Sequence, residues 1–378
     1  MSASRPRGAV ATLVSVDGWG AARYYRRART AHLERLSEMA PGDFLFRKRM
    51  YDFDDVLARS IPQVRQVSLA QVLWRVWTGR YSTLEVVEPY APSALPENLL
   101  IALACRLSPR PRARRTTLVS YAIENADVAG LVAAQLPLPA RAGRAAVAAA
   151  VGFVASTHGR IAFGTSAAMS AYDALLGEGW RSTRSTRTTE IPGLPSASPV
   201  SGHPRTGGAV VFVGSLEERK GVPELLRAWS AVVEQEPGAQ LHILGKGELV
   251  GVVQEHARHD ASVTFTFDPP RSEIRATLDR ASVLVLLSRP GRRWKEQIGL
   301  PILEGLSHGL EIVSTDETGI AGWLANHAHQ VVPVEAGPQD IADAIVRAIR
   351  SPRSRTDITA ALPARDGRMQ ADDWLHRA

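Results

Sequence analysis

The sequence predicts an α/β protein with two domains, each built on a parallel sheet with helices on both faces. The length of 378 residues suits two domains. Short apolar runs alternate with helical patterns in both halves, which is how open parallel sheets are assembled. Residues 192–208 are rich in Pro, Ser and Gly, and the alternation restarts directly after them. This stretch is therefore expected to connect the domains.

These observations give the following expected boundaries. Residues 1–194 form an N-terminal Rossmann-like domain, and residues 195–207 form a linker. Residues 208–350 form a C-terminal Rossmann-like domain. For residues 351–378, one expectation is a tail that packs back on the N-terminal domain.

The N-terminal half is expected to begin with a strand over 9–16, a glycine turn at Gly18 and Gly20, and a helix over about 21–39. The basic, apolar opening resembles a signal peptide, but the run is short and ends at Asp17, so we interpret it as a strand. The further elements expected are strands over 82–87 and 116–123, an Ala-rich helix over 141–156, a strand over 160–163, and a helix capped by Ser166.

Polar side chains follow the strand predicted over 116–123. Glu124, Asn125 and Asp127 stand at its carboxyl end, the edge at which α/β proteins bind ligands. One interpretation is a loop that faces the acceptor or the sugar, with Gly18 on the same side. The other is a helix cap, because Asn and Asp favour that position. Both interpretations remain open.

The acidic cluster Asp52, Asp54 and Asp55 resembles the Asp-x-Asp metal clamp of another glycosyltransferase class. It follows no clear strand and lies close to three basic residues, Arg47, Lys48 and Arg49. We therefore expect surface ion pairs here and no metal site.

The C-terminal half has a clearer pattern. Its expected strands are 209–213, 241–244, 263–267, 283–287 and 311–315. A helix with one apolar face is expected from Val222, with Leu225, Leu226, Trp229, Val232 and Val233 marking that face.

Residues 288–318 organise this half. Glu296 and Glu304 are separated by seven residues, with the turn ending at Gly299 between them. A helix is expected from Leu300, with its apolar stripe on residues 300, 303, 306, 302 and 310. Glu296 thus lies where a strand ends and a helix begins, and the free N–H groups at Gly299 and Leu300 suit a phosphate.

Charge and cysteine content limit the partners and the compartment. Residues 1–194 carry 25 Lys and Arg against 15 Asp and Glu, and the rest carries 20 against 23. The basic half suits an anionic membrane surface, although a solvated Arg-rich surface explains it equally. We expect no nucleic-acid partner. The single cysteine fits a reducing compartment, so we expect a cytoplasmic protein, with the inner face of the membrane as one location. No run of 18 apolar residues exists to span a membrane.

Four motifs of the C-terminal half, in this order, resemble glycosyltransferase family 4, the retaining sugar-nucleotide transferases with the two-Rossmann GT-B fold. They cover roughly residues 208–350, whereas the N-terminal half resembles the family only in layout. The motifs are Gly214-Ser215-Leu with Lys220-Gly221, Ile243-Leu-Gly245-Lys-Gly247, the Glu296–Glu304 pair with Gly299-Leu300, and the strand before Thr318-Gly319.

The resemblance implies that the N-terminal domain binds the acceptor and that the C-terminal domain binds the nucleotide sugar. It also implies roles for these residues. Glu296 contacts the donor sugar, Glu304 accepts hydrogen bonds from the ribose hydroxyls, and Lys220 contacts the donor diphosphate. The Gly299 and Leu300 backbone completes the phosphate site, and an ammonium with oriented N–H groups stabilises a leaving diphosphate without a metal. We therefore expect no metal and no cofactor, and the nucleotide-diphosphate sugar is a co-substrate. Gly214, Gly245 and Thr318 complete the expected donor site.

One position departs from the family pattern. The family usually has an arginine, a second cation for the diphosphate, where this chain has Ser215. We expect Arg293 or Lys295 to supply that charge from the loop before Glu296; a basic loop that binds nothing is the alternative. The family's N-terminal histidine also has no clear match, and Glu124 or Asn125 is expected in its place.

The sequence thus predicts a retaining, metal-independent glycosyltransferase of the hexosyltransferase type. It would move a sugar from a nucleotide-diphosphate sugar to a glycan or lipid-linked acceptor in surface polysaccharide or glycoconjugate synthesis. The alternative is a non-catalytic GT-B partner subunit of a glycan assembly complex. Ser215 favours that alternative, and the glutamate pair favours the enzyme.

Overall fold

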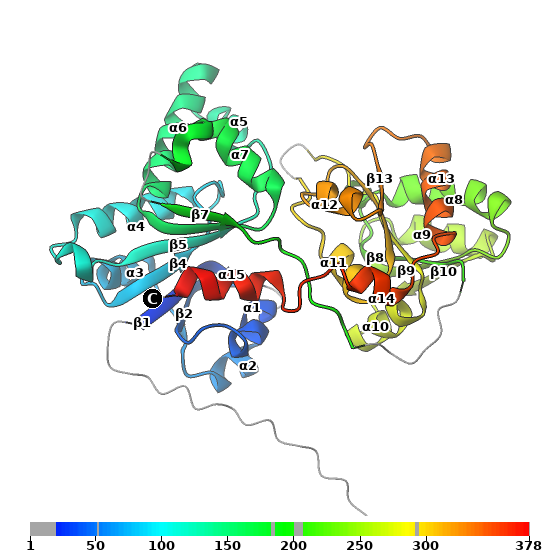
Figure 1. The fold of residues 1–378 in the computed structure, drawn as a ribbon, viewed down its shortest axis with the longest axis horizontal. Helices are drawn as coiled ribbons and strands as arrows, with labels where there is room; N and C mark the ends of the chain where they lie inside the picture. The colour runs from blue at the N-terminus through cyan, green and yellow to red at the C-terminus, as the bar shows by residue number, and fades with distance from the viewer. Residues whose placement is uncertain (1–19, 51–52, 183–185, 200–206, 292–294, 378) are drawn as a thin grey trace, which may run out of the picture.

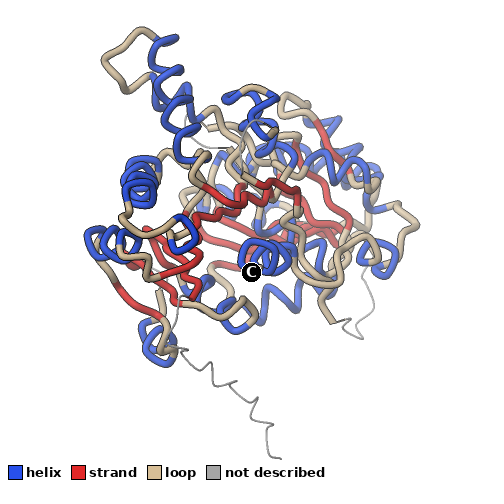
Figure 2. The backbone as a smooth tube through the Cα atoms, turned by 60° about the vertical axis from the view of Figure 1, so that its left-hand side comes forward, coloured by secondary structure: helices blue, strands red, loops and turns tan. Residues whose placement is uncertain are grey.

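The computed structural model describes residues 20–50, 53–182, 186–199, 207–291 and 295–377. The chain forms two α/β domains, as the sequence predicts (Figure 1). All strand pairs in both sheets are parallel. Figure 2 shows the strands at the centre of the molecule with helices on both sides.

The N-terminal domain contains a seven-stranded sheet in the order β3-β2-β1-β4-β5-β6-β7. Its strands are β1 (Gly20–Ala28), β2 (Asp43–Arg49), β3 (Val64–Gln66), β4 (Tyr81–Val86), β5 (Thr117–Ala122), β6 (His158–Phe163) and β7 (Arg187–Glu190). Its helices are α1 (Thr30–Glu34), α2 (Asp55–Ser60), α3 (Leu69–Trp77), α4 (Leu95–Leu107), α5 (Val128–Ala133), α6 (Ala140–Ala155) and α7 (Ser166–Leu176).

The C-terminal domain contains a six-stranded sheet in the order β10-β9-β8-β11-β12-β13. Its strands are β8 (Ala209–Ser215), β9 (Gln240–Lys246), β10 (Val263–Phe267), β11 (Val283–Leu286), β12 (Glu311–Thr315) and β13 (Gln330–Val332). The helices that follow the linker are α8 (Val222–Gln235), α9 (Val250–His259), α10 (Arg271–Arg280), α11 (Leu300–Ser307), α12 (Ala321–Asn326), α13 (Pro338–Ile349), α14 (Arg355–Thr359) and α15 (Gly367–His376).

The opening of the chain differs from the prediction. The expected strand over 9–16 and Gly18 lie outside the described residues. The helix expected over 21–39 is wrong, because residues 20–28 form strand β1 and α1 spans only five residues. Alternate β1 side chains face opposite sides of the sheet: Ala22 and Tyr24 pack in the main core of this domain, whereas Arg23 faces α15. The arginines of this strand look like the exposed face of a helix in the sequence. Asp372, the acid that neutralises Arg23, lies far along the chain, so the local sequence does not show that Arg23 is buried.

Two smaller expectations also need correction. Ser166 is the first residue of α7, and the residue that caps the helix is Thr165, whose hydroxyl accepts from the Ala168 N–H. In the apolar stripe expected on α11, Ile302 and Leu306 are buried, but Leu300 is 66% exposed. Leu300 opens the helix at the edge of the sheet, where the core no longer covers it.

Helix α15 leaves the C-terminal domain and packs on strands β5 and β6 of the N-terminal domain (Figure 1). Its Asp372 is fully buried and forms a bidentate pair with Arg23. Arg368 and His376 of the same helix bind Glu85 of β4. Burial alone would raise the pKa of Glu85, but the charges of Arg368, His376 and Arg23 outweigh it and lower this pKa to about 2. We call these five residues the α15 clasp.

The two segments that cross between the domains touch each other. The Gly367 N–H donates to the Leu194 carbonyl at 2.8 Å, and a Cβ at residue 367 would fall 1.9 Å from the Pro192 carbonyl oxygen. The close approach therefore requires glycine at this joint. No helix in the described part of the chain is both long and apolar enough to cross a membrane.

Candidate functional site

Glu296 and Lys220 meet at the carboxyl edge of the C-terminal sheet. Lys220 ends a short 3-10 helix (Glu218–Lys220) after β8, and Glu296 lies in the loop between β11 and α11. Their side chains form an ion pair while only 12% and 10% exposed. The Ser288 hydroxyl donates to the same Glu296 oxygen, Oε2, at 2.9 Å. The two residues singled out in the sequence thus share one buried charge pair.

Glycine lets the Lys220 turn approach strand β11. Gly221 has a φ of +72°, in the left-handed region, and a Cβ there would fall 2.1 Å from the Leu287 carbonyl oxygen. The turn is further tied to β11 by the Arg289 N–H, which donates to the Arg219 carbonyl at 2.9 Å. The Lys220-Gly221 pair therefore places an ammonium against the end of a central strand.

Glu304 lies one helical turn into α11 and is paired with Arg271 of α10 at 2.5 Å. The Arg271 side chain is 72% exposed, and that of Glu304 is 27% exposed. From the sequence, only ligand hydroxyls were expected to contact this carboxylate. The structure shows that an arginine of the same domain already neutralises it.

The glycines of the expected donor site hold the strand ends close together. A Cβ at residue 245 would fall 1.9 Å from the Gly214 carbonyl oxygen, which links β9 to β8. Gly299 has a φ of +86° and starts α11, so the helix N-terminus faces this edge. The Thr318 hydroxyl donates to the Ile298 carbonyl at 2.8 Å and so braces the same turn.

Ser215 ends β8 without a cationic group. Its hydroxyl forms a hydrogen bond with Glu217. Burial would raise the pKa of Glu217, but the hydrogen bonds from Arg219 and Ser215 lower it. Arg219 is itself paired with Glu217 at 2.5 Å. Arg293 lies outside the described residues. Lys295 is partly buried next to Glu296 and Glu317.

The N-terminal domain contributes Glu124 and Asn125 to the same place. The Asn125 side-chain amide donates to the Glu296 carbonyl at 3.0 Å, and the Gln297 side chain donates to Glu124 Oε2 at 3.0 Å. Asp127 instead caps α5, because it accepts from the Gly130 N–H. The helix-cap interpretation is therefore confirmed for Asp127, whereas Glu124 and Asn125 contact the Glu296 loop.

A cavity of about 170 Å³ opens where the two domains meet. Its walls come from the ends of β4 and β5 on one side and from the Glu296 loop on the other. It is lined by Pro92, Glu124, Ala126, Val128, Leu131, Lys295, Glu296 and Gln297. The N-terminal domain supplies the apolar residues and Glu124, and the C-terminal domain supplies the polar residues of the Glu296 loop.

Glu88 was missed by the sequence analysis. This buried carboxylate follows β4 and accepts from the backbone N–H groups of Ile123 and Glu124 at 2.8 and 2.9 Å. Tyr172 donates to its other oxygen at 3.3 Å. Burial raises the pKa of Glu88 to about 8, with the Glu124 charge adding to the rise and the two N–H groups opposing it. Glu88 thus holds the loop that carries Glu124 and Asn125.

Glu317 is a second missed residue. It is buried after β12, and within the described residues its Oε1 has no hydrogen-bond partner. Burial raises its pKa, and the Lys295 charge opposes that rise. The same sequence signal existed for both residues, because each lies at the end of a predicted strand. Glu88 directly follows the strand predicted over 82–87, and Glu317 lies two positions after the strand predicted over 311–315.

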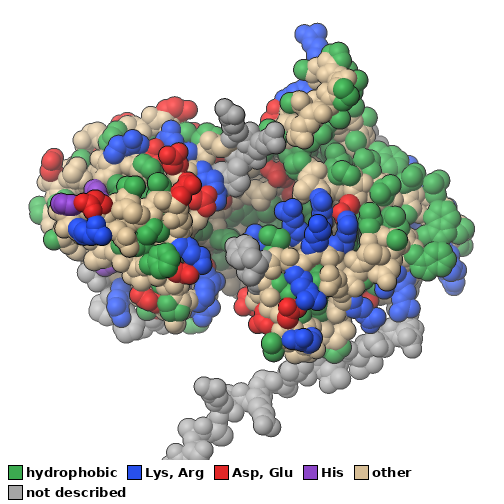
Figure 3. All heavy atoms as spheres, turned by 180° about the vertical axis from the view of Figure 1, so that it is seen from behind, with side chains coloured by type: hydrophobic (Ala, Val, Ile, Leu, Met, Phe, Trp, Pro, Cys, Tyr) green, Lys and Arg blue, Asp and Glu red, His purple; other side chains and the backbone are tan. Residues whose placement is uncertain are grey.

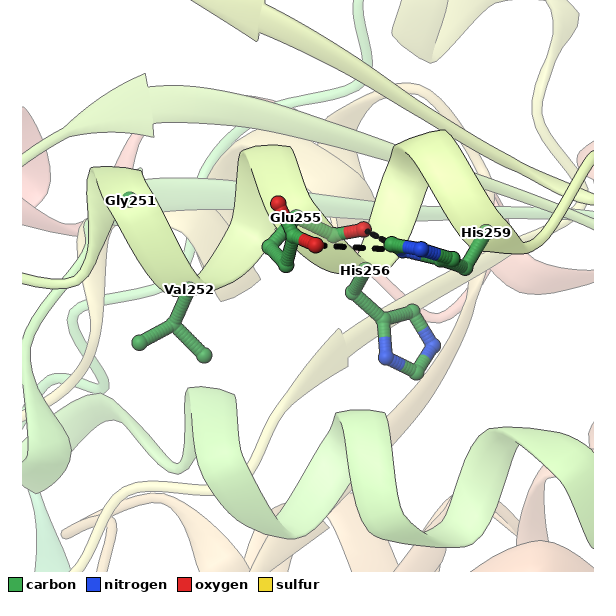
Figure 4. Close-up of a pocket in the computed structure, with 5 residues that line it drawn as sticks. All are labelled: Gly251, Val252, Glu255, His256 and His259. Atoms are coloured by element: carbon green, nitrogen blue, oxygen red, sulfur yellow. Dashed lines mark hydrogen bonds and ion pairs between the residues drawn. The ribbon is translucent and has the colours of Figure 1, made fainter.

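Two other clusters do not build a catalytic site. Glu85, Asp372 and His376 come close enough to share a metal ion, but Arg23 and Arg368 already neutralise these carboxylates. A surface hollow of about 560 Å³ runs along α9, as Figure 4 shows. It is lined by Gly251, Val252, Glu255, His256 and His259, and the imidazole of His259 bonds within its own helix. None of the donor-site residues lines it.

The family model for glycosyl transferases group 1 matches residues 207–351. The C-terminal domain belongs to this family. The chain is 26% identical over 177 residues to phosphatidyl-myo-inositol mannosyltransferase of Mycobacterium tuberculosis, with 46% of each chain covered. It is 30% identical over 152 residues to the glycogen synthase of the same species, covering 39% of this chain and 34% of the relative. The chain thus spans less than half the length of these curated relatives.

Solved structures match nearly the whole length of the chain. The lipopolysaccharide outer core galactosyltransferase WaaB has a TM-score of 0.59 at 13% identity, covering 90% of this chain and 94% of its own. HepE of Anabaena, solved in complex with UDP, also has a TM-score of 0.59 at 13% identity, covering 94% and 95%. At this identity the matches show the fold, and they confirm the predicted GT-B arrangement.

Proposed function

We propose that this protein is a retaining glycosyltransferase that moves a sugar from a nucleoside-diphosphate sugar to a glycan or lipid-linked acceptor. The observation that carries the proposal is the buried Lys220–Glu296 pair at a sheet edge that also faces Glu124 and Asn125 of the other domain. The family of the C-terminal domain supports the reaction class. A donor bound at this edge would place its sugar in the interdomain cavity.

Lys220 is assigned to the leaving diphosphate. Its ammonium has three donors and is held by Glu296 in a mostly buried position, where a fixed charge acts more strongly than in water. The N–H groups of Gly299 and Leu300 open α11 towards the same edge and would bind phosphate oxygens. Together they stabilise the negative charge that develops as the sugar–phosphate bond breaks.

Glu296 is assigned to the donor sugar. Ser288 and Lys220 both engage Oε2, and no hydrogen bond to Oε1 comes from the described residues. Oε1 can therefore accept from a sugar hydroxyl. In the retaining reaction the acceptor oxygen bonds the anomeric carbon on the face that the diphosphate leaves, and the departing phosphate takes the acceptor proton. No protein carboxylate needs to act as a nucleophile.

The proposal includes independence of metal ions. Lys220, the helix N-terminus and a second cation from Lys295 or Arg293 supply the positive charge that a metal would otherwise provide. Turnover should therefore survive excess chelator. Loss of turnover on chelation, with recovery on adding Mg²⁺ or Mn²⁺, would remove this part of the proposal.

The deciding experiment measures nucleoside diphosphate released from a panel of nucleotide sugars. UDP-sugars come first, because HepE is solved with UDP. We expect release with at least one donor, and loss of that release in Lys220→Ala and Glu296→Gln. Release that survives both variants would contradict the site assignment.

A second candidate function rests on Ser215. The expected second cation is absent there, and Arg219 is held by Glu217. This favours a non-catalytic partner subunit of a glycan assembly complex, which would bind a nucleotide without turning it over. Nucleotide binding with no release from any donor, in the presence of acceptor extracts, would favour this candidate.

The proposal also includes the location of the protein in the cell. We place the protein in the cytoplasm, in contact with an anionic membrane through its basic N-terminal half, which is where a lipid-linked acceptor would be met. The excess of basic residues in 1–194 supports this location.

A further inference from the structure

Helices α3 and α4 expose large apolar side chains on the outside of the N-terminal domain. Trp74 is 67% exposed and Trp77 38% exposed, and α4 adds Leu100, Leu103 and Leu107 at 47%, 45% and 58%. The two helices pack against each other, and the residues of each set lie three or four positions apart, so each set occupies one side of its helix. Figure 3 shows apolar side chains gathered at this end of the domain. Clustered apolar exposure of this kind marks an interaction site.

Arginines accompany this apolar face. Positions 75, 80, 106, 110, 112, 114 and 115 are all arginine, whereas residues 67–84 and 98–123 contain no Asp or Glu. The loop after α4 sits against the end of α3: the Ser108 hydroxyl donates to the Trp77 carbonyl at 2.8 Å, and Arg110 donates to the Thr78 carbonyl at 3.1 Å. Within the described residues, none of these seven arginines forms an ion pair with an acid.

We propose that this α3–α4 face, defined by the five apolar residues and seven arginines named above, docks on a bilayer of anionic phospholipid. Stable attachment of a peripheral protein needs two signals, apolar insertion and charge attraction, and this face supplies both. Tryptophan favours the level of the headgroups, where its ring is apolar and its N–H is hydrated. The long arginine side chains reach phosphates around the inserted residues.

The same observations disfavour two other occupants. A symmetric dimer through this face would place seven arginines against the same seven, without acids to neutralise them. A nucleic acid would use the arginines and could stack bases on the two tryptophans, but it would leave the exposed leucines of α4 without an apolar partner. An anionic bilayer uses both parts of the face.

This inference extends the proposed function by naming the surface through which a lipid-linked acceptor would be approached. Vesicle binding requires no turnover, however, so the two proposals succeed or fail separately. If donor turnover is absent but the protein binds vesicles through this face, the docking proposal stands and the transferase proposal fails.

The test is co-sedimentation of the full chain with vesicles of phosphatidylcholine alone or with added phosphatidylglycerol. We expect sedimentation with the anionic vesicles, weakened by salt. Trp74→Ser should reduce the bound fraction. The triple variant R110Q, R112Q and R114Q should lower the partition coefficient by about tenfold or more, because each basic residue near the surface adds to the attraction. Trp74 and these arginines are exposed, so the fold should survive, and thermal melting checks that it does.

Matched controls lie on the C-terminal domain. Val252→Ser and Phe267→Ser remove exposed apolar side chains, and the triple variant R258Q, R275Q and R280Q removes the same charge. These controls should sediment like the unaltered protein. Failure of the unaltered protein to bind anionic vesicles would overturn the proposal. An equal loss of vesicle binding in the control variants would also overturn it. The proposal would fail as well if the protein formed a dimer that Trp74→Ser dissociates, or if it bound single-stranded nucleic acid that vesicles could not displace.

Discussion

The two domains share an architecture but use buried charge differently. In the C-terminal domain the central strands β8 and β11 are apolar on both faces, and Lys220 and Glu296 lie beyond their carboxyl ends. In the N-terminal domain the central strands β1 and β4 carry Arg23 and Glu85 inside the sheet, where α15 covers them. One domain places charge at its ligand edge, and the other places charge in its core.

Because of this difference, removing a buried charged side chain should have different effects in the two domains. A charge beyond a strand end can be changed without disturbing the sheet, so its loss should affect ligand and turnover. A charge within a covered sheet face is costly once its partner is removed. Glu311 is the exception in the C-terminal domain. It pairs with Arg353 and His329 at the opposite, amino end of β12, away from the site.

The largest expected effect is structural and falls on the α15 clasp. Asp372→Ala leaves the Arg23 guanidinium, 1% exposed, without its bidentate partner. We expect a loss of about 3–5 kcal/mol in the free energy of unfolding, measured by urea titration. The neighbouring control Asp373→Ala removes an exposed pair with Arg365 and should change stability little. If Asp372→Ala is as stable as the unaltered protein, the buried charges of the N-terminal domain do not stabilise its core, and the difference drawn between the domains is wrong.

The second effect is a pH dependence caused by Glu88. Its pKa is about 8 in the folded protein against 4.5 ordinarily, so the folded state binds a proton that the unfolded state has lost. Stability from this group is complete below pH 4.5 and is lost as pH rises through about 8. The linkage amounts to something on the order of 5 kcal/mol, at about 1.4 kcal/mol for each pKa unit.

The variant Glu88→Gln isolates this pH dependence, because glutamine mimics the neutral carboxyl group. The fall in unfolding free energy between mildly acidic and mildly alkaline pH should flatten in this variant. Glu190→Gln, at an exposed position on β7, should retain the slope. If both variants keep the slope, Glu88 is ionised in the folded state and the two N–H donors outweigh its burial.

The contrast also explains what the sequence could predict. Strands β10 and β12 match their expected ranges, and Lys220 and Glu296 meet, because their motifs are local and directly follow apolar runs. Strand β1 could not be recognised, since Arg23 is buried through a partner 349 residues away. Nothing in the neighbouring residues encodes that pairing.

Two site features were hidden for related reasons. The contact of Asn125 with the Glu296 carbonyl depends on how the domains face each other, which no local pattern specifies. Glu88 looks like an ordinary acid in sequence, and its role appears only when β4 and β5 bring it under the Glu124 loop. The cap assigned to Asp127, by contrast, was one of the two open interpretations and is a local property.

The third expected effect is catalytic. Lys220→Ala should lower turnover by about 10²-fold or more, the scale of a lost transition-state contact. Thermal stability should change far less, because the residue lies beyond the strand end. Lys48→Ala, at an exposed position on β2 of the N-terminal domain, is the matched control. Turnover retained within a few-fold would show that another cation serves the diphosphate.

The fourth effect concerns the nucleotide. Glu304→Gln should weaken binding of UDP or of the preferred nucleoside diphosphate by about 1–3 kcal/mol, the range of a hydrogen bond to a charged group. Calorimetric titration measures it. Glu273→Gln, on the exposed side of α10, should bind as the unaltered protein does. An unchanged dissociation constant with an intact fold would remove Glu304 from the nucleotide site.

The smallest effect tests whether Arg271 belongs to the fold or to the ligand. Its pair with Glu304 is exposed on the arginine side, so Arg271→Ala should change stability by less than about 1 kcal/mol. Because Arg271 competes with a ligand for the Glu304 carboxylate, its removal should leave nucleotide binding unchanged or slightly tighter. The double variant R271A and E304Q should then bind like E304Q alone. If Arg271→Ala instead weakens binding as much as Glu304→Gln does, the arginine contacts the nucleotide itself. The C-terminal edge would then hold a cation that the motifs did not reveal, and the contrast between a locally encoded site and a distantly paired core would need revision.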